Sequence, residues 1–253
     1  VKSRESRPIT DIKQTFESSA ELYADNVAFR QKFKKDEPYT TITYKEALAD
    51  VNGLGTALIN RGLKGRRVGI IGETRYQWES SYLAVLNGTG IVVPLDKELA
   101  ARDLEQLIID AEVSAVMFDK KFEKMFREMK AEGNAKLDVL VNFDAEEHTE
   151  EVLSWKQLIA EGKDMVACGD RQFLDAEIRG DEMSIILYTS GTTGIAKGVM
   201  LSHYNLAYDL MSAPTVLKVH TDDIFFSVLP VHHTYECTCA FLMPLYKGAS
   251  IAF

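Results

Sequence analysis

Short apolar runs alternate with segments of helical periodicity along most of this 253-residue chain. In the helical segments apolar residues recur every three or four positions, as at Val51, Leu54 and Leu58, which places them on one helix face. The apolar runs lack that spacing and are typical of strands that are buried on both sides. The pattern predicts an α/β protein, a layered α/β/α fold with mostly parallel sheets.

The predicted elements fall into two blocks. The first block contains expected helices at 12–23, 45–61, 76–87, 101–111 and 121–132, an extended stretch at 39–44, and strands at 67–72, 91–95, 115–119 and 138–143. The second contains strands at 183–188, 224–229 and 249–253 and helices at 203–217 and 235–245. Residues 144–181, rich in Asp, Glu and Gly and with one amphipathic segment around 152–159, are expected to form a surface connection. We therefore divide the chain into a first α/β subdomain at 1–181 and the start of a second at 182–253.

Composition and charge exclude some classes of function. The chain is 46% hydrophobic, which is enough for a sizeable core, and 38 acidic residues outnumber 29 basic ones to give a formal charge of −9. No general basic face is available, so nucleic acid is not an expected partner. Three cysteines and the absence of an apolar leader predict a cytoplasmic protein. The chain opens without Met and ends in an apolar run, from which we expect a fragment of a longer protein.

A glycine-rich stretch follows the apolar strand expected at 183–188. Residues 188–198 read Tyr-Thr-Ser-Gly-Thr-Thr-Gly-Ile-Ala-Lys-Gly. The glycines allow close backbone approach, the hydroxyl and N–H groups offer donors to phosphate oxygens, and Lys197 adds a cation. The spacing fits neither the P-loop of the NTPases nor the dinucleotide fingerprint. The stretch therefore predicts a phosphate-binding loop, and the alternative is an ordinary surface turn.

The longer run YTSGTTGIAKGVMLSH at residues 188–203 resembles the phosphate-binding signature of the adenylate-forming superfamily, closest to its long-chain fatty acyl-CoA synthetases. One departure is Ala196, where the family more often has proline, and a less rigid loop is expected there. Three further passages are similar to family segments: residues 43–48, 92–96 and 229–236. The resemblance covers nearly the whole chain and implies the first part of the family's large N-terminal domain.

The resemblance implies a two-step reaction. A carboxylate attacks the α-phosphate of Mg-ATP to give acyl-adenylate and pyrophosphate, and coenzyme A then displaces AMP. The residues implied to hold ATP are Tyr188, Thr189, Ser190, Gly191, Thr192, Thr193, Gly194 and Lys197, with Thr189 also expected in the Mg²⁺ shell. His233 is implied to be catalytic, near the substrate carboxylate. Its alternative is a hydrogen-bonded histidine at a helix start.

Other possibilities stay open beside this interpretation. His232, His233, Cys237 and Cys239 are a conceivable zinc set, which the sequence disfavours because Cys237 and Cys239 would lie on different helix faces. The acceptor could be an acyl carrier protein, or the chain could be a non-catalytic phosphate or acyl binder. Later family motifs that complete the magnesium site and hold the ribose do not occur in the sequence. The resemblance thus implies a chain that is inactive alone, small-molecule substrates, and a parent that associates peripherally with membranes.

Overall fold

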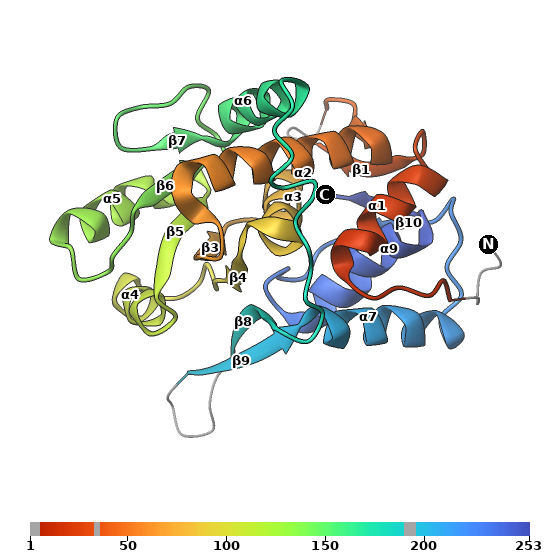
Figure 1. Cartoon of the computed structure of the whole chain (residues 1–253). Coiled ribbons are helices and arrows are strands. Elements are labelled where there is room, and N and C mark those ends of the chain that lie inside the picture. The colour runs from red at the N-terminus through yellow and green to blue at the C-terminus, as the bar shows by residue number, and fades with distance from the viewer. Residues whose placement is uncertain (1–5, 33–35, 190–195) are drawn as a thin grey trace.

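The computed structural model describes residues 6–32, 36–189 and 196–253. The helices are α1 Ile12–Leu22, α2 Tyr44–Leu58, α3 Tyr76–Ala84, α4 Ala101–Asp110, α5 Glu123–Glu132, α6 Trp155–Ala167, α7 His203–Ser212, α8 Thr234–Glu236 and α9 Met243–Lys247. The strands are β1 Val27–Gln31, β2 Thr40–Thr43, β3 Arg67–Ile71, β4 Ile91–Pro94, β5 Val113–Phe118, β6 Val139–Asn142, β7 Leu153–Ser154, β8 Met183–Thr189, β9 Lys197–Ser202, β10 Ile224–Phe226 and β11 Ser250–Ala252. Figure 1 shows these elements in chain order.

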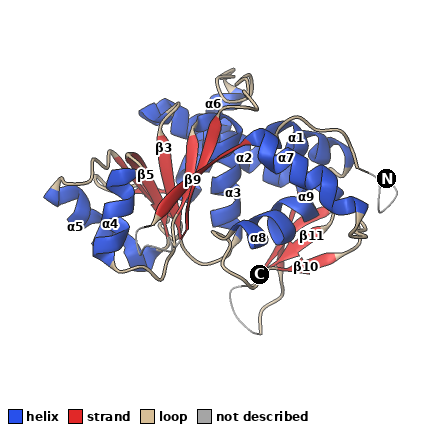
Figure 2. Ribbon diagram, turned by 90° about the horizontal axis from the view of Figure 1, so that it is seen from below, coloured by secondary structure: helices blue, strands red, loops and turns tan. Residues whose placement is uncertain are grey.

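A seven-stranded sheet forms the centre of the fold, with the strand order β7-β6-β5-β3-β4-β8-β9. Every neighbouring pair in it is parallel except β8 and β9, which form an antiparallel pair. Helices α4 and α5 cover one face, and α2 and α3 lie on the other (Figure 2). The predicted layered α/β/α fold with mostly parallel sheets is therefore confirmed.

Alternating side chains of the central strands bury into two separate cores. In β5, Ala115 and Met117 enter the core beside α2 and α3, whereas Val116 and Phe118 enter the core beside α4 and α5. All four are fully buried. Burial on both faces explains why these strands read as uninterrupted apolar runs in the sequence.

A second, four-stranded sheet has the order β10-β11-β1-β2. It joins strands from the two ends of the chain, since β1 pairs in parallel with β11 and Phe29 lies opposite Ile251. The central sheet likewise takes β8 and β9 from the second predicted block. Both sheets therefore contain strands from either side of residue 181, and the sheets do not divide there. Strands β1 and β9 were not predicted from the sequence.

The segment 144–181 is more than the surface connection expected from its composition. It contributes β7 to the central sheet and the 13-residue helix α6, which crosses α2. The crossing is close because two glycines meet: a Cβ atom on Gly162 would lie 1.8 Å from the carbonyl oxygen of Gly53. The ammonium of Lys13 also donates to the carbonyl oxygens of Phe173, Leu174 and Ala176, which fixes the end of the segment against α1.

Local signals set the helix boundaries. At the start of α2, the Thr43 hydroxyl accepts a hydrogen bond from the Glu46 N–H, and the Glu46 carboxylate accepts one from the Thr43 N–H, a capping box. The predicted stop at Gly62 is confirmed by its φ of +81°, a left-handed conformation that favours glycine. None of the described helices is long and apolar enough to span a lipid bilayer.

Candidate active site

The glycine-rich stretch connects two antiparallel strands. It leaves β8 at Thr189 and enters β9 at Lys197, and these two residues lie opposite each other in the register of the hairpin. Ser190, Gly191, Thr192, Thr193 and Gly194, which the sequence predicts to hold ATP, lie outside the described residues. The hairpin projects from the body of the molecule (Figure 1). A strand on each side therefore fixes where the two ends of the predicted loop lie.

The loop end of the hairpin borders a pocket of about 400 Å³ at the carboxyl ends of β4 and β8. Ligands of open parallel sheets bind outside the carboxyl ends of strands, where the strand order reverses. Here the strand order reverses between β3 and β5, so this pocket lies at the carboxyl edge of the sheet but beyond β4 from the reversal itself. Residues lining it are Pro94, Asp96, Leu99, Leu107, Leu187, Tyr188, Thr189, Ala196, His232, His233 and Thr234. The pocket thus brings together three residues that the sequence predicts for the site, from two distant segments.

Tyr188 and Thr189 end β8 on the pocket side. The Tyr188 hydroxyl donates a hydrogen bond of 2.6 Å to the Asp110 carboxylate, which anchors the strand end to α4. Burial and this carboxylate raise the pKa of Tyr188, so the phenol stays protonated and remains a donor at neutral pH. Thr189 is exposed, and its hydroxyl makes no hydrogen bond to another described residue.

Lys197 begins β9 and is exposed to solvent. Across residues 6–32, 36–189 and 196–253 it makes no ion pair, and it does not line the pocket as Thr189 does. An exposed ammonium on a long, rotatable side chain at the loop end of the hairpin is suited to contact phosphate oxygens. The role of Lys197 in ATP binding stays a prediction.

His233 comes to the pocket through a turn that is fixed from beneath. The turn is closed by a bond from the His233 N–H to the Pro230 carbonyl oxygen. The Glu236 carboxylate, which is 4% exposed, accepts hydrogen bonds from the Ser227 hydroxyl at 2.6 Å and the Leu229 N–H at 3.3 Å. Glu236 therefore holds the chain that leads to His233, a role that the sequence did not reveal.

The two neighbouring histidines differ in their surroundings. The His233 ring is exposed to the pocket and forms no side-chain cap at the start of α8, although that was the alternative to a catalytic role. The His232 ring is largely buried and packs against His233, with ring centroids 4.3 Å apart. Burial lowers the pKa of His232, and this effect outweighs the opposing effect of Asp96.

A charged cluster at the carboxyl ends of β3 and β5 adjoins the pocket. Glu73 accepts charge-assisted hydrogen bonds from Lys121 and Lys97, which lower the pKa of its carboxyl group. The Glu73 N–H in turn donates to Asp119 at 2.6 Å, and Arg75 also pairs with that carboxylate at 3.1 Å. These contacts tie together the loops that follow three parallel strands and keep the sheet edge polar.

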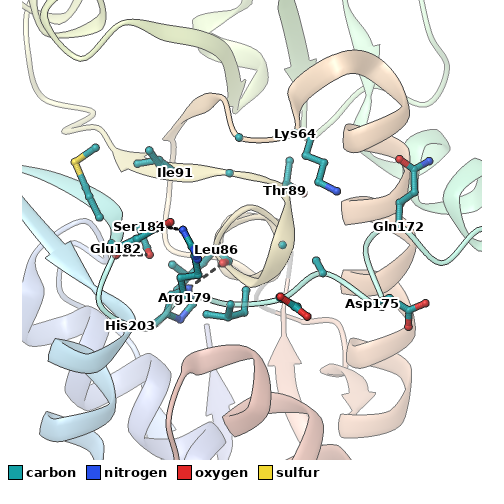
Figure 3. Close-up of a pocket in the computed structure, with 17 residues that line it drawn as sticks. Lys64, Leu86, Thr89, Ile91, Gln172, Asp175, Arg179, Glu182, Ser184 and His203 are labelled. Carbon is teal, nitrogen blue, oxygen red and sulfur yellow. Dashed lines mark hydrogen bonds and ion pairs between the residues drawn. The ribbon is translucent and has the colours of Figure 1, made fainter.

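The molecule has a larger pocket of about 690 Å³ at the opposite edge of the sheet (Figure 3). It lies at the amino ends of β4 and β8, beside Ile91 and Ser184. Its buried histidine, His203, has both ring nitrogens engaged, with the Ile12 N–H and with the Leu86 carbonyl oxygen. None of the predicted site residues lines this pocket. Its larger volume therefore does not mark it as the ATP site that the sequence predicts.

The donor set at the hairpin suits a hard cation held mainly by phosphate and water. Thr189 offers one exposed hydroxyl there, which fits the predicted minor share of a Mg²⁺ shell. Within the described part of the chain, no three His, Cys, Asp or Glu side chains are grouped so as to hold a metal ion. Cys237 is buried beside Tyr82, and burial raises the pKa of its thiol to about 12.

Comparison with known proteins decides the family. A sequence model described as AMP-binding enzyme matches residues 16–253. The chain belongs to this AMP-binding enzyme family. It is 29% identical to long chain acyl-CoA synthetase 2 of Arabidopsis thaliana, over 96% of this chain and 39% of that protein. It is also 29% identical to fatty acyl-CoA synthetase A of Dictyostelium discoideum, over 96% of this chain and 36% of that one.

Solved structures show the same fold. A long-chain-fatty-acid-CoA ligase from Archaeoglobus fulgidus superposes with a TM-score of 0.81 at 18% identity, covering 99% of this chain and 48% of that one. The ATP-bound MatB protein from Rhodopseudomonas palustris superposes with a TM-score of 0.76 at 26% identity, covering 96% of this chain and 45% of that one. The family member described here thus spans well under half the length of the curated relatives that it matches.

Proposed function

We propose that this chain supplies the phosphate-binding part of an enzyme that activates a long-chain fatty acid. The reaction converts the acid and ATP to acyl-adenylate and pyrophosphate, and coenzyme A then takes the acyl group and releases AMP. The observation that carries the proposal is the loop end of the hairpin beside a pocket at the carboxyl edge of the sheet, where Tyr188, Thr189 and His233 converge. The curated relatives named as acyl-CoA synthetases support the substrate class.

Each residue of the site has a proposed role that follows from its chemistry. Lys197 and the backbone N–H groups of the loop neutralise the terminal phosphates, which become the leaving pyrophosphate. Thr189 would offer its hydroxyl to a Mg²⁺ ion bound with ATP, and such an ion would supply charge neutralisation at the phosphates. His233 lines the same pocket and orients the carboxylate that attacks. Positioning and electrostatic stabilisation then account for the catalysis of adenylate formation.

A second acceptor has specific support. The chain is 25% identical, over 93% of its length and 34% of the other protein, to a chloroplastic long-chain-fatty-acid–[acyl-carrier-protein] ligase of Arabidopsis thaliana. That protein's name specifies a carrier protein in place of coenzyme A. Both acceptors follow the same adenylation step, so the site described here serves either one.

The proposal assigns the complete reaction to a longer protein and none of it to this chain alone. Its test is ATP–pyrophosphate exchange that depends on palmitate, measured for this chain and for a form extended by the remaining family motifs. The extended form should exchange pyrophosphate, and Lys197→Met should reduce the rate about tenfold or more. Exchange by the chain alone would contradict the assignment to a longer protein. An inactive extended form with every fatty acid tried would refute the proposed function.

A further inference from the structure

His232 lies between a fixed carboxylate and the proposed catalytic histidine. Its ring contacts His233 at a centroid distance of 4.3 Å and an interplanar angle of 41°. On its other side, the His232 Nε2 atom lies 3.6 Å from Oδ1 of Asp96. All three side chains line the same pocket, although Asp96 follows β4 and the histidines precede α8.

The His232 Nε2 atom is buried and has no hydrogen-bond partner among residues 6–32, 36–189 and 196–253. Buried polar atoms are nearly always partnered, because burial without a partner costs free energy. The distance of 3.6 Å to Asp96 exceeds that of a hydrogen bond, so a small movement of the ring would close the pair. His232 therefore lies close to Asp96 but does not form a hydrogen bond with it.

Asp96 is itself held in place. The Glu98 N–H donates a hydrogen bond of 2.9 Å to the same Oδ1 atom that faces His232. The residue directly follows Leu95, which is buried in the core beside α4. The carboxylate is thus fixed by a local turn at the end of a buried strand, so it offers a stable reference point for the imidazole.

The His233 ring, by contrast, has few contacts that fix its orientation. Its side chain is exposed and makes no hydrogen bond to any residue in the described part of the chain. The contact with His232 is therefore the clearest restraint on the direction of its ring. We propose that His232, once its ring closes on Asp96, is a positioning residue that holds the His233 ring toward the pocket.

This inference rests on the proposed function for the role of His233, but not for the linkage among the three side chains. Other charges near His232 come from the same loop as Asp96: Glu98 raises the pKa of His232, and Lys97 lowers it. From β8, Tyr188 also lines the pocket, and its hydroxyl is engaged with Asp110. Asp96 is the nearest carboxylate to the His232 ring, so it is the first residue to substitute in a test.

The linkage is tested on this chain by NMR of ¹⁵N-labelled histidine side chains, assigned through single His→Gln variants. Asp96→Asn should shift the ring resonances of His233, although the two side chains have no direct contact in the described structure. The same substitution should have no such effect in the His232→Gln background, because the linkage passes through His232. An equal shift in both backgrounds, or none in either, would overturn the proposal. Asp103→Asn, an exposed change of equal charge on α4, should leave the His233 resonances in place.

The consequence for function is tested in the extended form. His232→Gln should lower kcat for palmitate-dependent exchange about tenfold while the KM for ATP changes little. Asp96→Glu should retain more activity than Asp96→Asn. A loss confined to KM, or equal losses for both Asp96 variants, would contradict positioning. If the extended form is inactive, the proposed function fails, and the NMR result still decides whether His232 links Asp96 to His233.

Discussion

The carboxyl group of Glu79 predicts an unusual dependence of stability on pH. Glu79 lies on α3 with no exposed surface, and neither carboxyl oxygen has a hydrogen-bond partner among the residues that the structure describes. Burial, and then the nearby carboxylate of Glu236, raise its pKa well above the usual value of 4.5. The folded protein therefore keeps Glu79 protonated at pH values where the unfolded chain ionises it.

The direction of the effect follows from proton binding. Above the pKa of the unfolded chain, the folded state binds one proton more, so the free energy of unfolding falls as pH rises. The fall continues until the raised pKa of the folded state is reached. The slope attributable to Glu79 is at most about 1.4 kcal/mol per pH unit, the free-energy equivalent of one pKa unit. Glu79→Gln removes this slope because the amide does not titrate.

The assay is urea unfolding of the wild type and of Glu79→Gln from pH 5 to pH 8. The unfolding free energy of Glu79→Gln minus that of the wild type should increase as the pH rises. A constant offset from the packing of Gln does not affect this change. Tyr82→Phe, in the same buried region, is the control and should shift stability equally at every pH, because burial keeps Tyr82 protonated throughout. Parallel curves for Glu79→Gln and the wild type would refute the reasoning.

Three further predictions concern packing and buried polar contacts, each measured by urea unfolding. Gly162→Ala should destabilise the fold by about 1 to 3 kcal/mol, because its Cβ would meet the backbone of α2. The control Asp164→Ala, on the exposed side of α6, should not destabilise it. Equal stabilities of the two variants would contradict the close crossing of α2 and α6. Lys13→Met should cost about 2 to 3 kcal/mol, since three carbonyl oxygens lose a charged donor; an unchanged midpoint would show that the contacts contribute nothing. Ser227→Ala should cost about 1 to 2 kcal/mol and weaken the hold of Glu236 on the turn before His233. No loss of stability in that variant would count against the role given to Glu236.

The sequence predicts the α/β class because buried strands and amphipathic helices leave different periodicities. Helix α1 and the stop at Gly62 follow from local patterns and are confirmed. Strand β9 was missed because its residues are largely exposed and partly polar, as is typical of an edge strand. Strand β1 was missed because, within the described part of the chain, it pairs with residues 40–43 and 250–252, and a pairing with the far end of the chain leaves no local pattern in the sequence.

The site was predictable in part. The loop signature and His233 carry recognisable residue patterns, and the structure brings Tyr188, Thr189 and His233 to one pocket. Asp96 could have been found by asking which polar residue follows a buried strand at the carboxyl edge of the sheet. The contact of His232 with Asp96 depends on how β4 and the turn before α8 come together in space. No local pattern in the sequence encodes that approach.

The central claim is that the hairpin loop binds the terminal phosphates of ATP. Its most direct test is calorimetry of this chain with Mg-ATP, magnesium pyrophosphate and AMP, comparing the wild type with Lys197→Met. The account predicts that the substitution weakens the binding of ATP and pyrophosphate about tenfold or more and leaves the affinity for AMP unchanged, because AMP lacks the terminal phosphates. Equal affinities of both proteins for pyrophosphate would contradict it.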